Sequence, residues 1–305
     1  MEQSQNTGFA NFSILRKNII SKSTGTLVVA AAHDKHTLEA VYAYEKEIPL
    51  NYILVGDRHK IMALAAEIGW TPNEETIVNC TDDEKCASVA VKLIRDGTAQ
   101  VLMKGILDTG TLLKAVLDKD EGIRDNEIMS HIAMLEVPGY HKLVIITDGG
   151  MITNPNLEQK QAIVLNAVNF LRKLGIATPK VAALCAGEAV SPKLAETVEA
   201  RALQNMAKEG AFGSCILEGP ISFDLAVDPS SARTKGFESE ITGEVDILLV
   251  PEITAGNALA KGLIQWGRAT MAGCVVGAKA PIVLASRAAS AKEKLLSMMI
   301  CMAGA

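Results

Sequence analysis

The sequence predicts an α/β fold with parallel or mixed sheets, and two observations carry that prediction. Short apolar runs alternate with longer segments of helical periodicity along most of the 305 residues. This rhythm is typical of parallel strands joined by right-handed crossovers. Hydrophobic residues make up 49% of the chain but aromatic residues only 4%. The core must therefore be built from Ala, Val, Ile and Leu, as is usual where helices cover a parallel sheet.

The first half of the chain predicts four strand–helix units. Each strand is a short apolar run, such as TLVVAAA from residue 26, and each is followed by polar turn residues and a longer amphipathic segment. Gly56-Asp57, for example, turns the chain from a strand into a helix. The expected strands are Thr26–Ala32, Asn51–Val55, Thr76–Asn79 and Gln100–Met103, and the helices after them are Thr37–Glu45, Arg58–Ile68, Asp83–Arg95 and about Gly110–Leu117.

The second half continues the alternation. Helix 155–174 has clear boundaries, because Asn154 can cap it, Pro155 fits its first turn and Gly175 stops it. Pro229–Gly236 is rich in Pro, Ser, Thr and Lys, which predicts a mobile surface segment. The other expected elements are strands Ser130–Val137, Lys142–Thr147, Val181–Cys185, Ser214–Leu217 and Val245–Val250, helices Leu194–Lys208, Asn257–Gln265 and Ala291–Met302, and an apolar run over Ala272–Ala285.

Two breaks in this pattern suggest two domains. Pro138-Gly139 separates two strands and is the best candidate for a hinge. Gly277–Pro281 is a candidate for a second crossing, after which the last helix returns to the first domain. The predicted domains are therefore residues 1–138 plus 279–305, and residues 139–278.

Charge and hydropathy exclude several classes of protein. The chain has 30 Lys+Arg against 35 Asp+Glu, a net charge of −5. Because nucleic-acid affinity depends on basic residues that neutralise phosphates, no nucleic-acid partner is expected. The start lacks the pattern of a signal peptide, and no apolar run approaches the ~18 residues of a membrane helix. We expect a cytoplasmic protein with no membrane partner.

The six cysteines do not form a recognisable framework. None of them forms C-x-x-C, and no histidine lies at metal-ligand spacing from them. This argues against both disulfides and a zinc site. Cys185 and Cys274 lie inside apolar runs, so we expect inert core thiols there.

In open α/β sheets, ligands bind outside the carboxyl ends of the strands, so the residues after each strand are the site candidates. Val245–Val250 is followed by PEITAGN, in which Thr254, Gly256 and Asn257 stand at a helix start. Free backbone N–H groups there would favour an anion. The alternative is a capped helix start with a turn glycine.

The last strand is followed by Ser286-Arg287. A hydroxyl and a guanidinium at a strand end suit a phosphate or a developing oxyanion. The alternative is a helix entry with a solvated arginine. Ser290 and Glu293 fit the S-x-x-E capping box, so Glu293 also has a purely structural explanation.

Two more strand ends carry polar residues. After Gln100–Met103 come Lys104 and the helix start Asp108–Thr111, where the lysine could meet a phosphate and Thr109 and Thr111 could donate hydrogen bonds. An ordinary helix cap is the alternative. Asp148-Gly149-Gly150 resembles a ligand-facing loop, although Gly-Gly also serves simple turns.

Several familiar motifs are absent. There is no G-x-x-x-x-G-K-[ST], the first βα turn lacks G-x-G-x-x-G, and no G-x-S-x-G occurs. These absences exclude a P-loop and weaken the cases for a Rossmann dehydrogenase and a serine hydrolase. The five histidines are scattered, and we expect surface or structural roles for them; the role of His131, in SHIAMLE, stays open.

The strand-end segments together resemble the phosphate acetyl/butyryltransferase family, and its phosphate butyryltransferase branch most closely. The resemblance covers nearly the whole chain after about residue 12. It is carried by VAAAHDKHTLEAV with ILVGD, LMKGILDTGTLLKAV, SHIAMLEVPGYHKLVIITDGGMITNPNLEQK, EGPISFDLAVD, VPEITAGNALAKGL and VLASRAASAKEKLLSM, in this order.

The resemblance implies an isocitrate/isopropylmalate dehydrogenase-like fold of two domains, with the active site in the interdomain cleft. It implies the reaction butyryl-CoA + phosphate = butyryl phosphate + CoA, with acetyl or branched acyl groups as alternatives. A non-catalytic acyl-CoA-binding protein is a more distant alternative. Family members are homo-oligomers, dimers or higher, and the chemistry needs no metal or organic cofactor.

The resemblance also implies roles for individual residues. Ser286-Arg287 matches a catalytic Ser-Arg pair, and Glu293 stands where the related acetyl enzymes have an Asp proposed as the base. Ile128 replaces an arginine of those enzymes, and Arg124 is the candidate to supply its charge. The catalytic set is Ser286, Arg287, Glu293 and Asn257, and the substrate-binding set is Lys104, Thr109, Thr111, Arg124, Ser130, Asp148, Thr254 and Gly256.

Overall fold

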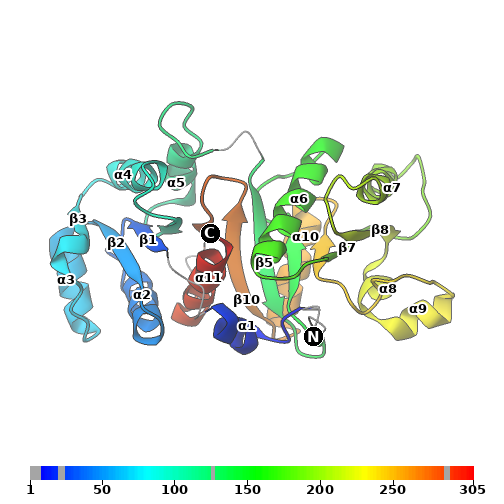
Figure 1. The fold of residues 1–305 in the computed structure, drawn as a ribbon, viewed down its shortest axis with the longest axis horizontal. Helices are drawn as coiled ribbons and strands as arrows, with labels where there is room; N and C mark the ends of the chain where they lie inside the picture. The colour runs from blue at the N-terminus through cyan, green and yellow to red at the C-terminus, as the bar shows by residue number, and fades with distance from the viewer. Residues whose placement is uncertain (1–7, 20–24, 125–127, 285–288) are drawn as a thin grey trace, which may run out of the picture. The chain divides into compact units, whose positions relative to one another are not determined.

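The protein divides into two compact units in a computed structural model that describes residues 8–19, 25–124, 128–284 and 289–305. Unit 1 consists of Met1–Leu15 and Ser130–Met271, and unit 2 of Arg16–Met129 and Ala272–Ala305 (Figure 1). The chain therefore passes from one unit to the other after residues 15, 129 and 271. The sequence predicted domain boundaries after residues 138 and 278 instead. Pro138-Gly139 lies inside unit 1, between two antiparallel strands.

Unit 2 is built on a sheet with strand order β3-β2-β1-β4-β11-β10. The pairs β2–β3, β1–β2, β1–β4 and β4–β11 are parallel, as the strand–helix alternation predicted. Leu27, Val28 and Val29 are fully buried. β1 is therefore covered on both faces, which explains its continuous apolar sequence. The strands are β1 (Thr26–Ala30), β2 (Asn51–Gly56), β3 (Ile77–Asn79), β4 (Val101–Lys104), β10 (Thr270–Val276) and β11 (Ile282–Val283).

The apolar run Ala272–Ala285 forms two strands. Gly277 has φ 89°, and the chain reverses there, so that β10 and β11 pair antiparallel with Cys274 opposite Val283. The sequence marked Gly277–Pro281 as a candidate crossing but not as a reversal of the chain, because Gly277-Ala278 lacks the Asn-Gly or Asp-Gly signature of a tight hairpin. Thr270 and Met271 at the start of β10 belong to unit 1.

The helices of unit 2 mostly begin at an acidic residue. Asp34, Asp57 and Asp82 each accept a hydrogen bond from the backbone N–H three residues later, which satisfies one of the free donors of a helix start. The helices are α2 (Lys35–Glu47), α3 (Arg58–Glu67), α4 (Asp83–Arg95), α5 (Thr109–Val116) and α11 (Ala291–Gly304), with a 3₁₀ turn η1 (Glu74–Thr76). Helix α1 (Phe12–Ile19), which the sequence did not predict, belongs to unit 1 as far as Leu15 and to unit 2 from Arg16.

Unit 1 is built on a sheet with strand order β5-β6-β9-β7-β8. β5 and β6 pair antiparallel, and β6–β9, β9–β7 and β7–β8 are parallel. The carboxyl ends of four strands thus meet at one edge, and the start of β5 joins them there. The strands are β5 (Ser130–Glu136), β6 (Val144–Thr147), β7 (Lys180–Leu184), β8 (Ile216–Ile221) and β9 (Ile247–Leu249).

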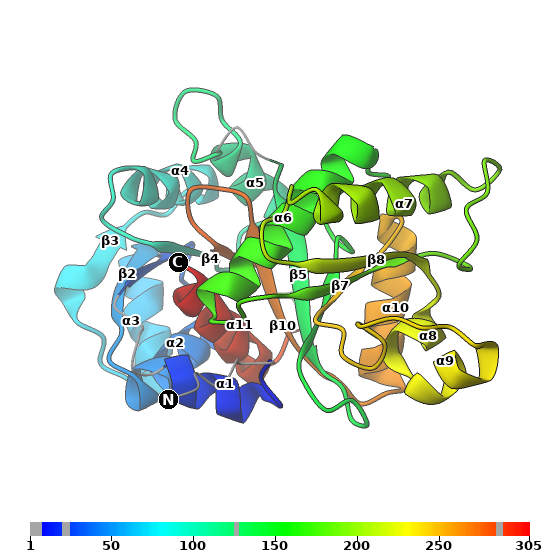
Figure 2. The ribbon, with the colours of Figure 1, turned by 45° about the vertical axis from the view of Figure 1, so that its right-hand side comes forward.

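Helices cover both faces of this sheet. α6 and α7 lie on one side of β7 and β8, and α8 and α9 lie on the other (Figure 2). Leu225, Ile241 and Leu248 belong to the buried cluster under α8 and α9, and Leu259 and Leu263 of α10 pack against it. The helices are α6 (Leu157–Lys173), α7 (Ala195–Lys208), α8 (Phe223–Val227), α9 (Pro229–Lys235) and α10 (Ile253–Gln265).

Two sequence predictions need correction in unit 1. Pro229–Gly236, expected to be a mobile segment, is helix α9: Asp228 accepts hydrogen bonds from the N–H groups of Ser230 and Ser231, and Pro229 takes the first helical position. The cap of α6 is Asn156, in a capping box with Gln159, rather than Asn154.

The cysteines are unpaired in the structure. All six cysteines are free, and Cys274 is buried, but Cys185 is only half-buried. Among the described residues no helix is long and apolar enough to cross a membrane.

Candidate active site

The strand-end residues singled out in the sequence fall in both units, and each unit is treated by itself. Lys104, Thr109, Thr111, Arg124 and Glu293 belong to unit 2, and Ser130, Asp148, Thr254, Gly256 and Asn257 to unit 1. Ser286 and Arg287 lie outside the described residues, between β11 and α11. Their catalytic role stays a prediction.

In unit 2, Lys104 ends β4 with its side chain buried. Its Nζ donates hydrogen bonds to the backbone oxygens of Gly105 and Leu107, both at 3.0 Å. The side chain is only 7% exposed, so these bonds satisfy an ammonium that would otherwise be costly to bury. Lys104 therefore shapes the loop that leads to α5.

The same loop lies against the end of β1. The N–H groups of Gly105 and Ile106 donate to the oxygens of Ala30 and Ala31, at 2.8 and 3.0 Å. A Cβ on Gly105 would lie 2.1 Å from the Ala31 oxygen, so only glycine fits there. Ala31 itself has φ 54°, an uncommon conformation for a residue with a side chain. The β4–α5 loop is thus held tightly between β1 and the ammonium of Lys104.

The start of α5 differs from the other helix starts of unit 2. Asp108 occupies the N-cap position but its side chain makes no capping hydrogen bond. Thr109 is exposed and Thr111 half-buried in the first turn, so their hydroxyl groups stand where a ligand could reach the helix start. Arg124 is exposed and its backbone pairs with that of Ala278.

Glu293 lies at the start of α11, in the capping box that the sequence predicted. Its Oε2 accepts hydrogen bonds from the backbone N–H and the hydroxyl of Ser290, at 2.8 and 2.9 Å, and the Ser290 oxygen accepts from the Glu293 N–H at 3.2 Å. The structural explanation for Glu293 is therefore confirmed. Whether the same carboxylate also moves a proton stays a prediction.

In unit 1, Asp148 organises the loop after β6. The side chain is 1% exposed, and its Oδ1 accepts from the N–H groups of His131, Gly150 and Met151 at 3.0–3.1 Å. Its Oδ2 accepts from the N–H of Ile152 at 3.0 Å. A carboxylate that accepts several backbone hydrogen bonds is strongly held in place. Asp148 therefore shapes the loop, and its buried oxygens are already occupied by backbone donors.

The start of α10 overturns one prediction. The helix begins at Ile253, four residues earlier than Asn257, and the Glu252 carboxylate accepts from the N–H groups of Thr254 and Ala255, both at 2.7 Å. The expectation of free N–H groups for an anion is wrong here, because the chain supplies its own anion. These hydrogen bonds, led by the one from Thr254, lower the pKa of Glu252 although burial acts in the opposite direction.

Gly256 and Asn257 lie within the first two turns of α10. A Cβ on Gly256 would come within 2.8 Å of the Cα of Gly149, so the glycine permits helix α10 to pack against the loop after β6. Asn257 is exposed beside it. The structure thus brings Gly149, Gly256 and Asn257 together at one edge of the sheet in unit 1.

Ser130 and His131 begin β5 at this same edge. Ser130 is fully buried, and its Oγ accepts from the Nδ2 of Asn166 at 3.1 Å, so its contact is with α6. The ring of His131 lies against Gly150, where a Cβ would fall 3.0 Å from the ring. The buried Nδ1 of His131 has no hydrogen-bond partner in the described part of the chain.

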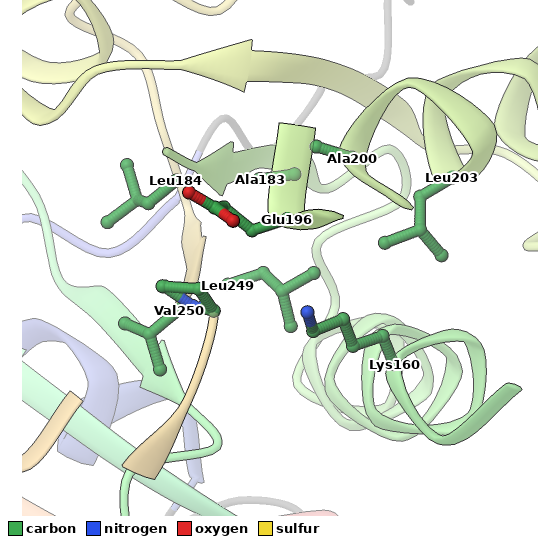
Figure 3. Close-up of a pocket in the computed structure, with 9 residues that line it drawn as sticks. Lys160, Ala183, Leu184, Glu196, Ala200, Leu203, Leu249 and Val250 are labelled. Carbon is green, nitrogen blue, oxygen red and sulfur yellow. The ribbon is translucent and has the colours of Figure 1, made fainter. Parts of the chain in front are cut away.

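A pocket at the ends of β7 and β9 was missed in the sequence (Figure 3). Leu184, Leu249 and Val250 form its apolar wall, and Lys160 and Glu196 bring charges to it. The buried ammonium of Lys160 forms an ion pair with Glu199 of α7. A signal for Lys160 exists in the sequence, since it lies three residues before Ile163 on the apolar face of its helix.

Metal ligands do not gather in the described part of the chain. Within residues 8–19, 25–124, 128–284 and 289–305, no group of three His, Cys, Asp or Glu residues could hold a metal ion. In unit 2, the Lys104 ammonium and the start of α5 are groups that suit an anionic ligand.

Comparison with known proteins places the chain in a family. The family model described as "Phosphate acetyl/butaryl transferase" matches residues 84–303. The chain therefore belongs to the phosphate acetyl/butyryltransferase family, as the strand-end segments predicted.

Individual relatives match most of the chain. A "Probable phosphate butyryltransferase" of Bacillus subtilis (strain 168) is 39% identical over 288 residues, which cover 93% of this chain and 96% of the relative. A "Phosphate acetyltransferase" of Rhizobium meliloti is 41% identical over 248 residues, 81% of this chain and 78% of the relative. The crystal structure of a branched-chain phosphotransacylase from Enterococcus faecalis V583 matches with a TM-score of 0.81 and 33% identity, covering 92% of this chain and 99% of that one.

Proposed function

We propose that this protein is a phosphate acyltransferase that moves a short acyl group, preferentially butyryl, between coenzyme A and inorganic phosphate. Membership of the family over residues 84–303 is the observation that carries the proposal. The butyryl preference rests on the resemblance to the butyryltransferase branch. Acetyl and branched acyl groups remain alternatives, since relatives of all three descriptions match this chain.

The chemistry is a direct transfer. A phosphate oxygen attacks the thioester carbonyl carbon, the C–O bond forms, and negative charge gathers on the carbonyl oxygen. The C–S bond then breaks, and coenzyme A leaves as a thiolate that takes up a proton. Hydrogen-bond donors aimed at the developing oxyanion each contribute about 2.7–4 kcal/mol to such reactions. No covalent intermediate with the protein is needed.

Ser286 and Arg287 are proposed to stabilise that charge, with Arg287 offering the planar two-pronged fork that fits phosphate or an oxyanion. The start of α5 is proposed to hold a phosphate group of either substrate, which is supported by the exposed position of Thr109 in the first turn and by the loop that the Lys104 ammonium holds in place. Thr109 and Thr111 would donate to the same group. Arg124 is proposed to supply the charge that Ile128 lacks.

Glu293 is the proposed base of the reverse direction, in which the coenzyme A thiol gives up its proton before it attacks the acyl phosphate, and this proposal has a physical cost. A coenzyme A thiol with a pKa near ~8.5 and a carboxyl with a pKa near ~4.3 differ by about four units, or roughly 5.7 kcal/mol of unfavourable proton transfer. The capping box holds Glu293 as an acceptor of hydrogen bonds from Ser290. If Glu293 is only a cap, the thiolate takes its proton from solvent or phosphate.

Four further features are proposed on the family resemblance. They are an isocitrate/isopropylmalate dehydrogenase-like fold, a homo-oligomeric state, a cytoplasmic location, and chemistry without a metal or organic cofactor. Acyl-CoA and phosphate are the proposed partners, with no nucleic acid or membrane among them. Sedimentation of the purified protein tests the oligomeric state, and assays with and without chelator test the cofactor proposal.

The reaction itself is tested by thiol release from acyl-CoA substrates of increasing chain length, with and without phosphate. The proposal expects release only with phosphate and the highest kcat/KM with butyryl-CoA. Because one methylene changes binding in an apolar pocket by only about 1–3 kcal/mol, the preference is expected to be graded. Phosphate-independent release, or no release with any short acyl-CoA, would overturn the assignment.

A further inference from the structure

His131 is held firmly at the edge of the sheet in unit 1, although no role has been assigned to it so far. Its backbone N–H donates to Asp148 Oδ1 at 3.1 Å, and its backbone oxygen accepts from the Thr147 hydroxyl at 2.8 Å. The register of β5 on β6 pairs Ala133 with Ile146, which puts His131 beside the end of β6. The residue thus lies where a ligand of an α/β sheet is expected.

One nitrogen of its ring, Nδ1, is shut off from solvent. Nδ1 is buried and has no hydrogen-bond partner among the described residues, whereas the residue as a whole is partly exposed. Gly150 leaves room for the ring, since a Cβ there would fall 3.0 Å from Cγ and 3.2 Å from Nδ1. A buried polar atom without a partner in a native structure calls for an explanation, and one explanation is a role in ligand binding.

The surroundings of the ring favour one protonation state. Burial lowers the pKa of His131, and the nearby carboxylate of Asp148 opposes this effect without cancelling it. Both oxygens of that carboxylate already accept backbone hydrogen bonds. A proton on Nδ1 would have no acceptor, so the neutral ring is expected to carry its proton on Nε2.

We propose that His131 is a neutral hydrogen-bond donor of the acyl-transfer site, which presents Nε2–H to a substrate oxygen. The proposal rests on the proposed function and deepens it, because it names a residue of unit 1 that would bind the substrate. The acceptor of this hydrogen bond would be a negatively charged oxygen. That oxygen belongs either to bound phosphate or to the tetrahedral intermediate. A neutral imidazole suits this role because it donates without being able to lose its proton to the substrate.

The protonation state is tested without any assay of activity. Histidine labelled with ¹⁵N gives signals for only five residues, and the His131→Gln variant identifies the signal of His131. The proposal expects the neutral Nε2–H form of His131 from about pH 6.5 upward, where an ordinary histidine is still half protonated. Addition of phosphate, and separately of coenzyme A, should shift this signal. Three results would overturn the proposal even in an active enzyme: titration of His131 near pH 6.5, a proton on Nδ1, or a His131 signal that neither compound shifts.

Two substitutions then test which nitrogen acts. The side-chain amide of Gln reaches the position of Nε2, whereas that of Asn reaches only the position of Nδ1. The kcat/KM of His131→Gln should therefore fall by less than about 10-fold, and that of His131→Asn by about 100-fold or more. Contact with bound phosphate predicts a higher KM for phosphate, whereas contact with the oxyanion predicts a lower kcat at unchanged KM. Equal losses in both variants, at unchanged melting temperature, would contradict an Nε2–H donor.

His141→Gln is the matched control, because His141 is an exposed histidine whose Nε2 lies near Glu244. It should leave turnover unchanged. Gly150→Ala adds a methyl group against the ring, so the proposal expects it to shift the His131 signal and to lower kcat. If Gly150→Ala alters the His131 signal but keeps full activity, the ring has no part in catalysis and the proposal is overturned. Failure of phosphate-dependent turnover in the unaltered protein would instead overturn the proposed function.

Discussion

The starts of α5 in unit 2 and α10 in unit 1 look alike in sequence and differ in structure. Both follow a buried strand, both have an acidic residue at the N-cap, and both carry threonine and glycine in the first turn. At α10 the Glu252 carboxylate accepts two backbone hydrogen bonds at 2.7 Å. At α5 the side chain of Asp108 makes no capping hydrogen bond.

The difference is that a carboxylate of the chain occupies the start of α10, whereas the Asp108 side chain does not cap the start of α5. The positive end of a helix favours an anion, and a carboxylate of the chain competes with phosphate for the same N–H groups. Three other helices of unit 2, α2, α3 and α4, begin with an aspartate that does cap. A sequence can therefore identify an acidic N-cap, but the structure is needed to see whether that carboxylate occupies the helix start.

The largest effect is expected at Arg287. Arg287→Ala should lower kcat/KM by about 100-fold or more, because a charged donor to the oxyanion is lost. If Arg287 were only a surface arginine, its substitution would change the free energy of unfolding by no more than about 0.5 kcal/mol and would leave turnover intact. Steady-state kinetics and thermal melting separate the two cases. Arg287→Lys should restore only part of the rate, since the planar fork is lost; near-normal turnover of Arg287→Ala would remove it from the site.

Lys104 tests whether the shape of the β4–α5 loop matters. Lys104→Met keeps the apolar stem but leaves the oxygens of Gly105 and Leu107 without this donor, so the free energy of unfolding should fall by about 1–3 kcal/mol. The KM for phosphate should rise as the loop loosens. Lys114→Met on the exposed side of α5 is the control and should change neither. A destabilised Lys104→Met enzyme with unchanged KM would show that α5 does not hold phosphate.

Glu293 distinguishes a cap from a base. Gln can still close the capping box with Ser290 but cannot accept a proton, whereas Ala does neither. The base proposal expects Glu293→Gln to keep the melting temperature and lose most turnover. Glu293→Ala should lose about 1 kcal/mol of stability as well. Full turnover in Glu293→Gln would leave the cap as its only role.

The smallest effect is expected at Glu252, and it depends on pH. Its pKa in the folded protein is lowered, so its stabilising contribution is present above the unfolded pKa near ~4.3 and is lost as pH falls through the folded pKa. Glu252→Gln should therefore melt at a lower temperature than the unaltered protein at pH 7, and the difference should shrink below about pH 4. A difference that does not depend on pH would mean that charge at the start of α10 is unimportant.

Much of the fold was predictable because hydrophobic periodicity carries it. The strands β1, β2 and β4 and the helices that follow them fell close to their expected positions, since each is a short apolar run followed by an amphipathic segment. Helix α9 was missed because its Pro, Ser and Thr were interpreted as turn residues, although Asp228-Pro229 is also a helix start. Gly277–Pro281 was a candidate crossing in the sequence, but the reversal of the chain at Gly277 was not predicted, because no Asn-Gly or Asp-Gly pair marks it.

For the site, the sequence located the strand ends but could not show which polar groups are already satisfied. Asp148, Ser130 and Glu252 are ordinary candidates in sequence, and in the structure all three are engaged by the chain itself. The partner of Ser130 lies 36 residues away in the sequence. Asp148 and Glu252 reach backbone N–H groups close by only because their side chains turn toward the chain, which a sequence does not show. The capping box of Ser290 and Glu293 was predictable, because both partners lie within one turn of helix.

The central claim is acyl transfer to phosphate, and ³¹P NMR of the reaction products tests it most directly. The purified protein is incubated with butyryl-CoA and phosphate, and the new phosphorus signal is compared with the amount of free thiol. The account predicts butyryl phosphate and thiol in equal amounts, and the reverse reaction from butyryl phosphate and coenzyme A. Thiol release without any acyl phosphate would mean that water, and not phosphate, accepts the acyl group, and the account would be wrong.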